Sequence, residues 1–474
     1  MFGNGVKSGE LNFSQRVAYG LGHFMNDVCS GMWFTYTLLF YELVLKMPSS
    51  IAGLLVCVGQ VADAIASPIC GILIDRYGTR KSWHLIGTAF ITYSFVLIYS
   101  DCPWFPNTVM VVGNSTTDDD LPSWQNYNQI DIITGTIYFC FLVSIFQWGW
   151  ATVQIAHLAI ITDLAKDKNE RANLTALRYS AGVLAYMLVY LITWFILHVT
   201  KNDKGSIGPN DAYKFRSIAL LGLTIGGIFT VLFHVILKTP SDSGGGSDNK
   251  TKKGPTSWSQ IAKDYFKSIL LYQVILIYFT SRMLVNITMV YLPLYVVEKI
   301  GDEVEYIATV PLICYLASFF SSLIVRQCRK FISSKMFYII GMILSFCGCI
   351  WILRDFTHTA EIFGIAALLG AAGSVSGVAS LCLCADMIGT DTVNGAFVYS
   401  IVTAGDKFLG GLAILFIEHS KTALFSDPNL YYQNVMVYGC GIPSILGLIA
   451  LLTMYIDVYK SKIVIKQNGE SSSS

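Results

Sequence analysis

The chain has 474 residues, of which 54% are hydrophobic and only 13% are charged. This composition is too apolar for a soluble enzyme of this length, and a net charge of +1 gives no basis for binding nucleic acid. The sequence contains no nucleotide-binding loop, hydrolase elbow or zinc-protease helix, so we expect no enzymatic activity, no metal and no other cofactor.

Apolar runs of about 20 residues, the length needed to cross a bilayer, recur along the whole chain. They lie near residues 17–41, 50–74, 82–100, 132–161, 174–199, 216–238, 268–297, 304–325, 336–353, 361–385, 393–419 and 431–456. The sequence therefore predicts an all-α membrane protein with twelve transmembrane helices, which uses the lipid bilayer as its solvent.

The first run carries two ionisable residues, His23 and Asp27, four positions apart and hence on one face of a helix. An ionisable side chain near the middle of a bilayer costs roughly 2.5–3.5 kcal/mol, so it needs a partner or a function. Together the two residues can hold the ammonium group of a substrate, with His23 sensing pH. The alternative is a structural hydrogen bond between helices.

The second run contains Asp63 and, one turn later, Ser67, and a short basic hairpin follows it. A glycine allows close helix approach, the basic residues anchor the hairpin in the cytosol, and Asp75 can latch onto the end of a facing helix. We interpret the hairpin as a gate, and the alternative is that its basic residues are only anchors. The gate residues are Gly71, Asp75, Arg76, Gly78, Arg80 and Lys81.

Further polar residues interrupt the later runs. Arg178 and Arg282 are candidates for gripping a substrate carboxylate, because a guanidinium group binds a carboxylate through two parallel hydrogen bonds. Clamping two helices together is the alternative for both arginines. Gln154 and His157 can line a polar cavity, or simply form packing hydrogen bonds. Asn286 lies one turn from Arg282 on the same face, and Tyr399 can bound a small cavity or be an ordinary lipid-facing or core aromatic.

Between the sixth and seventh runs, residues 239–266 are rich in Gly, Ser, Lys and Asp and have no apolar period. This composition is typical of a flexible linker. It divides the chain into two six-helix bundles, residues 1–238 and 267–458, followed by a tail at 459–474. Secondary transporters built from two related halves bind their substrate near the bilayer midplane.

The orientation follows from the distribution of Lys and Arg. Of the 32 such residues, 21 lie on the side of the termini and the linker and 8 on the opposite side, which places both termini in the cytosol. The loop 101–130 then faces the lumen or the exterior and carries a glycosylation sequon at Asn114.

The hairpin resembles the signature loop of the major facilitator superfamily. Residues 63–71 are similar to the glycoside-pentoside-hexuronide:cation symporter branch of that superfamily, and the likeness extends to spans one, five, ten and eleven. It implies a substrate-binding acid at Asp27, a substrate-contacting arginine at Arg178, a family acid at Asp386 and a lysine beside the cation site at Lys407.

A second likeness is to a branch of the same superfamily that carries cysteine into lysosomes and melanosomes. It rests on residues 22–27, 32–36, 59–63, 81–87, 174–179 and 395–399, with Asp406 and Lys407. The resemblance implies a carrier, functional as a monomer, that moves cysteine or a close amino acid from the cytosol into an acidic lumen. The alternative is a cation-coupled symporter of a sugar or a lysolipid.

One departure from the symporter branch concerns coupling. Sodium-using members have a second aspartate where Ser67 stands, and a hard cation favours several anionic oxygens, so we favour proton coupling over sodium. We predict that Asp63 and Lys407 form a pair that breaks when a proton or substrate arrives, with Asp406 pairing elsewhere. The alternative is a permanent salt bridge between the halves.

Overall fold

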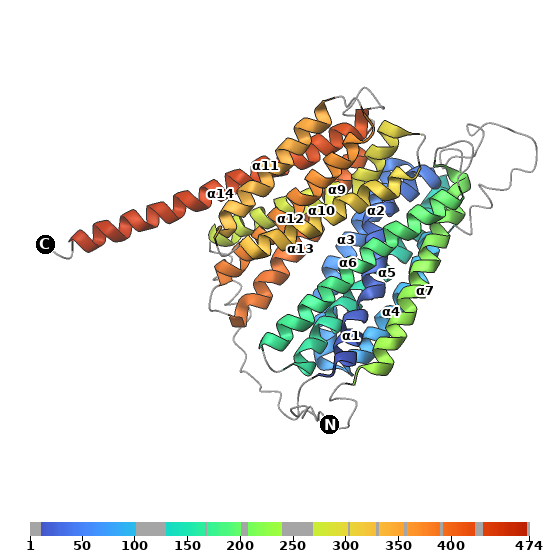
Figure 1. Cartoon of the computed structure of the whole chain (residues 1–474), viewed down its shortest axis with the longest axis horizontal. Coiled ribbons are helices and arrows are strands. Elements are labelled where there is room, and N and C mark those ends of the chain that lie inside the picture. Colours follow the sequence, from blue (N-terminus) through green and yellow to red (C-terminus); the bar gives the residue numbers. More distant parts are fainter. Residues whose placement is uncertain are drawn as a thin grey trace, which may run out of the picture. The chain divides into compact units, whose positions relative to one another are not determined.

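The structure is a computed structural model. It describes residues 11–100, 129–165, 168–200, 207–238, 269–301, 304–328, 331–354, 358–388, 392–421 and 430–471. All regular secondary structure in these ranges is helical (Figure 1). The chain divides into two compact units, residues 1–251 and 252–474. Asn114 and the predicted linker 239–266 lie outside the described residues, so the glycosylation site and the linker boundaries remain predictions.

The first unit begins with a helix that is broken in two. The predicted first span is not one helix, because α1 ends at Leu21 and α2 starts at Phe24. The elements of this unit are α1 (Phe13–Leu21), α2 (Phe24–Leu39), the π-helical turn η1 (Phe40–Val44), α3 (Ser49–Arg76), α4 (Arg80–Ile98), α5 (Gln129–Leu164), α6 (Lys168–Val199), the 3-10 turn η4 (Pro209–Asp211) and α7 (Ala212–Ile236).

The second unit consists of long helices and ends in the longest one. Its elements are α9 (Ile269–Ile300), α10 (Tyr306–Cys328), α11 (Ser334–Leu353), α12 (Glu361–Ile388), α13 (Thr392–His419) and α14 (Tyr431–Ser471). Most of the predicted tail, 459–474, is thus a continuation of α14 (Figure 1). The reason is local, since residues 455–468 contain neither Pro nor Gly to end the helix.

Nine helical segments of the described chain are long and apolar enough to cross a membrane. They lie in α3, α5, α6, η4 with α7, α9, α10, α11, α12 and α14. The three remaining predicted spans are occupied by α1 with α2, by α4 and by α13. The predicted all-helical architecture is confirmed, while the count of twelve spans remains a prediction.

Small residues set the closest helix contacts within each unit. In the first unit α4 crosses α5 at Gly87 and Gly149, where a Cβ atom on either glycine would lie 2.8 Å from the carbonyl oxygen of the other. Apolar helices gain little from hydrophobic burial inside a bilayer, so close backbone approach of this kind supplies much of their packing.

A similar contact in the second unit gives a stability prediction. A Cβ atom on Gly370 of α12 would collide with the backbone carbonyl of Cys314 on α10. We expect Gly370→Ala to destabilise the protein by about 1–3 kcal/mol or more, because the backbone of α10 has to move. Thermal unfolding of the purified protein in detergent measures the loss.

Gly377, two turns further along α12, is the matched control, because a Cβ atom there meets nothing within 4 Å. Alanine also favours a helix over glycine by roughly 0.5–1 kcal/mol. Gly377→Ala should therefore leave the melting temperature unchanged or raise it slightly. Equal melting temperatures for both variants would show that the α10–α12 contact is not tight.

Candidate functional site

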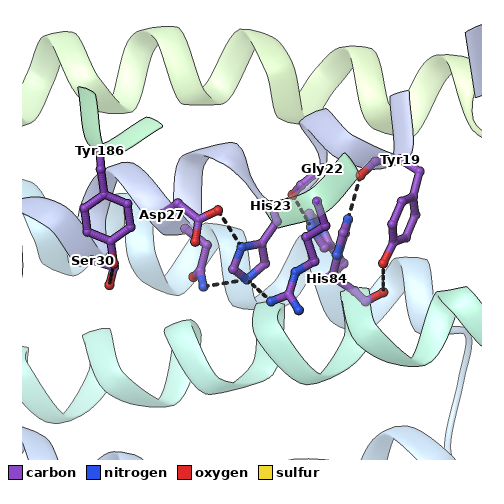
Figure 2. Close-up of polar contacts among 10 residues, drawn as sticks. Tyr19, Gly22, His23, Asp27, Ser30, His84 and Tyr186 are labelled. Carbon is purple, nitrogen blue, oxygen red and sulfur yellow. Dashed lines mark hydrogen bonds and ion pairs between the residues drawn. The ribbon is translucent and has the colours of Figure 1, made fainter. Parts of the chain in front are cut away.

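The break between α1 and α2 exposes backbone carbonyls inside the membrane-spanning region. Gly22 ends α1, and a Cβ atom on this residue would collide with the ring of Phe233, so only glycine fits here. Two histidines donate to carbonyls at the break. His84 of α4 donates from Nε2 to the Gly22 carbonyl at 2.9 Å, and His157 of α5 donates from Nε2 to the Tyr19 carbonyl at 2.8 Å (Figure 2).

An unsatisfied carbonyl in the hydrocarbon region costs several kcal/mol, so the bond from His84 to the Gly22 carbonyl stabilises the break. The Tyr19 carbonyl accepts from the Gly22 N–H at 3.2 Å as well as from His157. The two histidine bonds also fix both histidines in the tautomer that carries hydrogen on Nε2 when the ring is neutral. The ring of His157 additionally stacks on Tyr19, with centroids 4.3 Å apart. A break held in this way points the N-terminus of α2 into the unit.

His23 lies at this N-terminus, between the guanidinium group of Arg178 and the carboxylate of Asp27. Its Nε2 accepts from Arg178 at 2.8 Å and from the Asn26 amide at 3.1 Å, and its Nδ1 lies 2.9 Å from Asp27 Oδ2 (Figure 2). The guanidinium group and the amide nitrogen only donate, so Nε2 carries the lone pair and the N–H is on Nδ1. His23 is therefore a neutral bridge between Arg178 of α6 and Asp27 of α2.

Asp27 lies in the first turn of α2, where the helix dipole stabilises anions. Asp27 keeps 16% of its side-chain surface exposed, against 5% for His23. Gly182 of α6 leaves space beside the carboxylate, because a Cβ atom there would lie 3.0 Å from Asp27 Oδ2. The carboxylate of Asp27 thus contacts His23 on one side, while part of its surface remains exposed.

Several polar atoms around this cluster have no hydrogen-bond partner among the described residues. They are Arg178 Nε, Asn26 Oδ1, Gln154 Oε1, His157 Nδ1 and His23 Nδ1, whose N–H is not aligned with Asp27 despite the short distance. Buried polar atoms are rarely left unpaired, so a ligand with donors and acceptors of its own suits this site. Arg178 can bind a carboxylate and Asp27 an ammonium group.

Of the predicted substrate residues, the first unit therefore brings together Asp27, His23 and Arg178, with His157 beside them and Gln154 one turn away on α5. His157 and His23 have ring centroids 5.4 Å apart. The geometry is compatible with the predicted roles but does not test them.

Asp63 is buried on α3, with 3% of its surface exposed, and accepts a hydrogen bond from Ser67 Oγ at 3.1 Å. Two of the predicted coupling residues, Asp63 and Ser67, thus contact each other on one helix. Lys407 is half-buried on α13 in the other unit, so its pairing with Asp63 remains a prediction.

In the second unit Arg282 of α9 forms an ion pair with Asp406 of α13, with Nε 3.2 Å from Oδ2. Asn286, one turn along α9, also faces α13, since its Nδ2 would lie 3.3 Å from a Cβ atom on Gly410. The predicted residues Arg282, Asn286 and Asp406 are thus neighbours. Asp386 is exposed on α12, and the side chain of Tyr399 lies outside the described part of the chain.

The predicted gate hairpin is anchored to two neighbouring helices. Arg80 donates to Asp163 Oδ1 at 2.7 Å and to the Ala159 carbonyl at the end of α5, and Lys81 donates to the Leu237 carbonyl after α7 at 2.9 Å. Cations at helix C-termini are stabilised by the helix dipole. The turn itself needs Gly78, whose φ is +68°.

One gate residue differs from the prediction, and the side chain of another lies outside the described residues. A Cβ atom on Gly71 would meet nothing within 4 Å, so within its own unit Gly71 is not the close helix contact that we expected, and Gly87 and Gly149 take that part. Arg76 is exposed, and the side chain of Asp75 lies outside what the structure describes. The gating role remains a prediction.

The anchor gives a second stability prediction. Arg80→Ala removes a hydrogen bond and an ion pair between the start of α4 and the end of α5. Because Arg80 and Asp163 are about a third exposed, we expect a loss of only about 1 kcal/mol and a melting temperature lower by a few degrees. Arg76→Ala, at an exposed position on the same hairpin, is the control, and an equal loss in both would contradict the anchor.

Sequence reasoning missed Asn26, Gly182, His84 and His234 as neighbours of the site. One signal was available in the chain. The glycines at positions 20 and 22 lie within the first apolar run, and a glycine pair in a membrane helix marks a break. A broken helix in turn marks a binding site in transporters.

Comparison with known families agrees with the fold. A family model described as MFS/sugar transport protein matches residues 18–460. The chain belongs to the major facilitator superfamily. It is therefore a multi-pass membrane transporter of small molecules and not an enzyme.

Within the superfamily, the chain is similar to the major facilitator superfamily domain-containing protein 12 of Mus musculus. The two are 33% identical over 467 residues, which cover 93% of this chain and 94% of the mouse protein. The Homo sapiens protein of the same name is 33% identical over 429 residues, covering 86% of this chain and 85% of the relative. A solved D-xylose-proton symporter shares the fold with a TM-score of 0.67 at 16% identity, over 94% of this chain and 97% of that one.

Proposed function

We propose that this member of the major facilitator superfamily is an alternating-access carrier of a small zwitterionic amino acid, and that cysteine is its substrate. The carrier moves cysteine from the cytosol, where both termini lie, into the acidic lumen of lysosomes or melanosomes. It works as a monomer, and Asn114 carries a glycan on the lumenal side.

One observation carries the proposal: Arg178 and Asp27 flank the same imidazole in the first unit, at 2.8 Å and 2.9 Å. An amino acid presents a carboxylate and an ammonium group a few ångströms apart. It can bind Arg178 through the first and Asp27 through the second, replacing the contacts that His23 makes. Both charges of the site are then paired, which lowers the cost of burying them.

Sequence similarity supports cysteine as the substrate. The sequence segments at residues 22–27 and 174–179 contain Asp27 and Arg178, and they resemble the cysteine-carrying branch of the superfamily. The likeness to the domain-containing protein 12 of mouse and human spans most of both chains.

Coupling to protons, rather than to sodium, is the second part of the proposal. Asp63 has Ser67 as its hydrogen-bond partner in place of a second carboxylate, which weakens a sodium site. A pH difference of about two units is worth about 2.7 kcal/mol per proton, enough to drive the cycle. Asp63 and Lys407 form the pair that opens when the proton arrives, and Asp406 and Asp386 belong to the same coupling set.

Uptake into intact organelles tests the proposal. Labelled cysteine, cystine and a sugar are each offered to organelles from cells with and without the protein, in the presence and absence of a pH gradient. We expect carrier-dependent uptake of cysteine that falls when the gradient is collapsed. Uptake of the sugar alone would refute the amino-acid assignment.

The second candidate is a cation-coupled symporter of a sugar or a lysolipid. The matching family model includes sugar transport in its description, and the solved D-xylose-proton symporter shares the fold. Sodium-dependent uptake of either solute into vesicles would favour this candidate.

A further inference from the structure

Four of the seven histidines lie together in the first unit. His84 stands at the centre of this histidine array, with its ring centroid 6.0 Å from that of His157 and 5.1 Å from that of His234 on α7. His157 in turn lies 5.4 Å from His23, the bridge between Asp27 and Arg178. Titratable rings therefore run from the helix break to the end of α7.

The hydrogen bonds define where the protons are. His84 donates from Nε2 to the Gly22 carbonyl at 2.9 Å, so its Nδ1 carries the lone pair when the ring is neutral. That lone pair faces Nε2 of His234 at 3.1 Å. Since one hydrogen has to lie between the two nitrogens, His234 donates it from Nε2. The two imidazoles form a directed N–H···N pair.

We propose that the His234–His84 pair is a proton-binding site that passes the coupling proton between the helix break and the end of α7. A proton arrives at Nδ1 of His234, and the hydrogen on Nε2 of His234 moves to Nδ1 of His84. His234 is then neutral again, with its hydrogen on Nδ1, and His84 is an imidazolium with hydrogen on both nitrogens. One proton has entered, and the positive charge has moved one ring closer to Gly22.

The surroundings explain why this charge matters. His84 as a cation donates a charge-assisted hydrogen bond to the Gly22 carbonyl, which is stronger than a neutral one. The protonated pair thus tightens the break that positions His23 and Asp27. Among the described residues, the other ionisable groups near the pair are Lys81 on α4, His157 on α5, His23 beyond it, and Arg178 on α6, which contacts His23.

Lys81 anchors the end of α7 that carries His234. It lies one turn before His84 on α4, and its Nζ donates to the His234 carbonyl at 3.3 Å and to the Leu237 carbonyl at 2.9 Å. The end of α7 that carries His234 is therefore tied to the predicted gate hairpin. Proton exchange at this end therefore connects the helix break with the predicted cytosolic side.

The inference rests on the proposed transport of cysteine, and two assays in proteoliposomes separate the two. Counterflow of labelled cysteine at equal pH on both sides reports substrate exchange alone. Uptake driven by a pH difference of about one unit reports proton coupling, and one proton per cysteine supports about tenfold accumulation. No counterflow in the wild-type protein would refute the proposed function itself.

His234→Gln is the test variant, because His234 touches neither Asp27 nor Arg178 in the described contacts. We expect counterflow to stay within about twofold of wild type while the tenfold gradient-driven accumulation is lost. His198→Gln is the matched control, because His198 is exposed on α6 and stacks on Trp194 outside the array. Gradient-driven accumulation by His234→Gln at the wild-type level would overturn the proposal.

A spectroscopic measurement on the wild-type protein does not depend on any variant folding. Nitrogen-15 NMR of histidine-labelled protein in lipid bilayers detects a scalar coupling across an N–H···N bond. We expect this coupling between His84 and His234 and a joint change of both rings on acidification. Two rings that titrate independently, with no coupling between them, would also overturn the proposal.

Discussion

Asp27→Asn is expected to reduce cysteine uptake at least tenfold. The amide keeps the shape of the carboxylate but cannot form an ion pair with an ammonium group. A hydrogen bond to a charged partner is worth about 1.5–3 kcal/mol, which corresponds to a loss of roughly 10–150-fold. Uptake of labelled cysteine into proteoliposomes with equal amounts of each protein measures the effect.

Glu170→Gln is the control for this variant. Glu170 is a partly exposed carboxylate of the same unit, and it pairs with Arg16 at 2.9 Å rather than with the site. Its removal should leave uptake near the wild-type level. If Asp27→Asn transports cysteine as fast as Glu170→Gln, the ammonium-binding role of Asp27 is wrong.

Arg178→Ala is expected to have a comparable effect, because it removes the only cation that contacts His23 in the described structure. Without the guanidinium group the substrate carboxylate loses a charge-assisted bond and Asp27 loses its balancing charge. Breaking a buried charge network costs about 3–5 kcal/mol, so we expect uptake to fall more than a hundredfold.

Arg178→Lys separates charge from shape. Lysine keeps the positive charge but cannot bind a carboxylate with two parallel hydrogen bonds, so we expect an intermediate loss that appears mainly as weaker binding. Arg216→Ala, on the exposed face of α7, is the control and should transport normally. Full activity of Arg178→Ala in protein of normal stability would exclude a substrate contact.

Helical spans could be predicted well from the sequence because their signal is local. Every predicted span is occupied by a helix, since an apolar run of about 20 residues has few alternatives in a bilayer. The break at Gly22 was missed, because it depends on donors from His84 and His157 far away in the chain.

The site could be predicted only in part for the same reason. The spacing of His23 and Asp27 within one helix placed them on one face, and the structure agrees. The contact between His23 and Arg178 joins positions 155 residues apart, and no periodicity reveals it. Gly71 shows the reverse error, since a motif glycine suggested a close contact that its own unit lacks.

The most direct test of amino-acid recognition uses three competitors that differ by one group. Cysteine, cysteamine without the carboxylate and 3-mercaptopropionate without the ammonium group each compete with labelled cysteine for binding to the purified protein. We predict that cysteine competes at least tenfold better than either analogue, because Arg178 and Asp27 each require their own partner. Equal competition by an analogue that lacks one of the two charged groups would contradict binding of a zwitterion between Asp27 and Arg178.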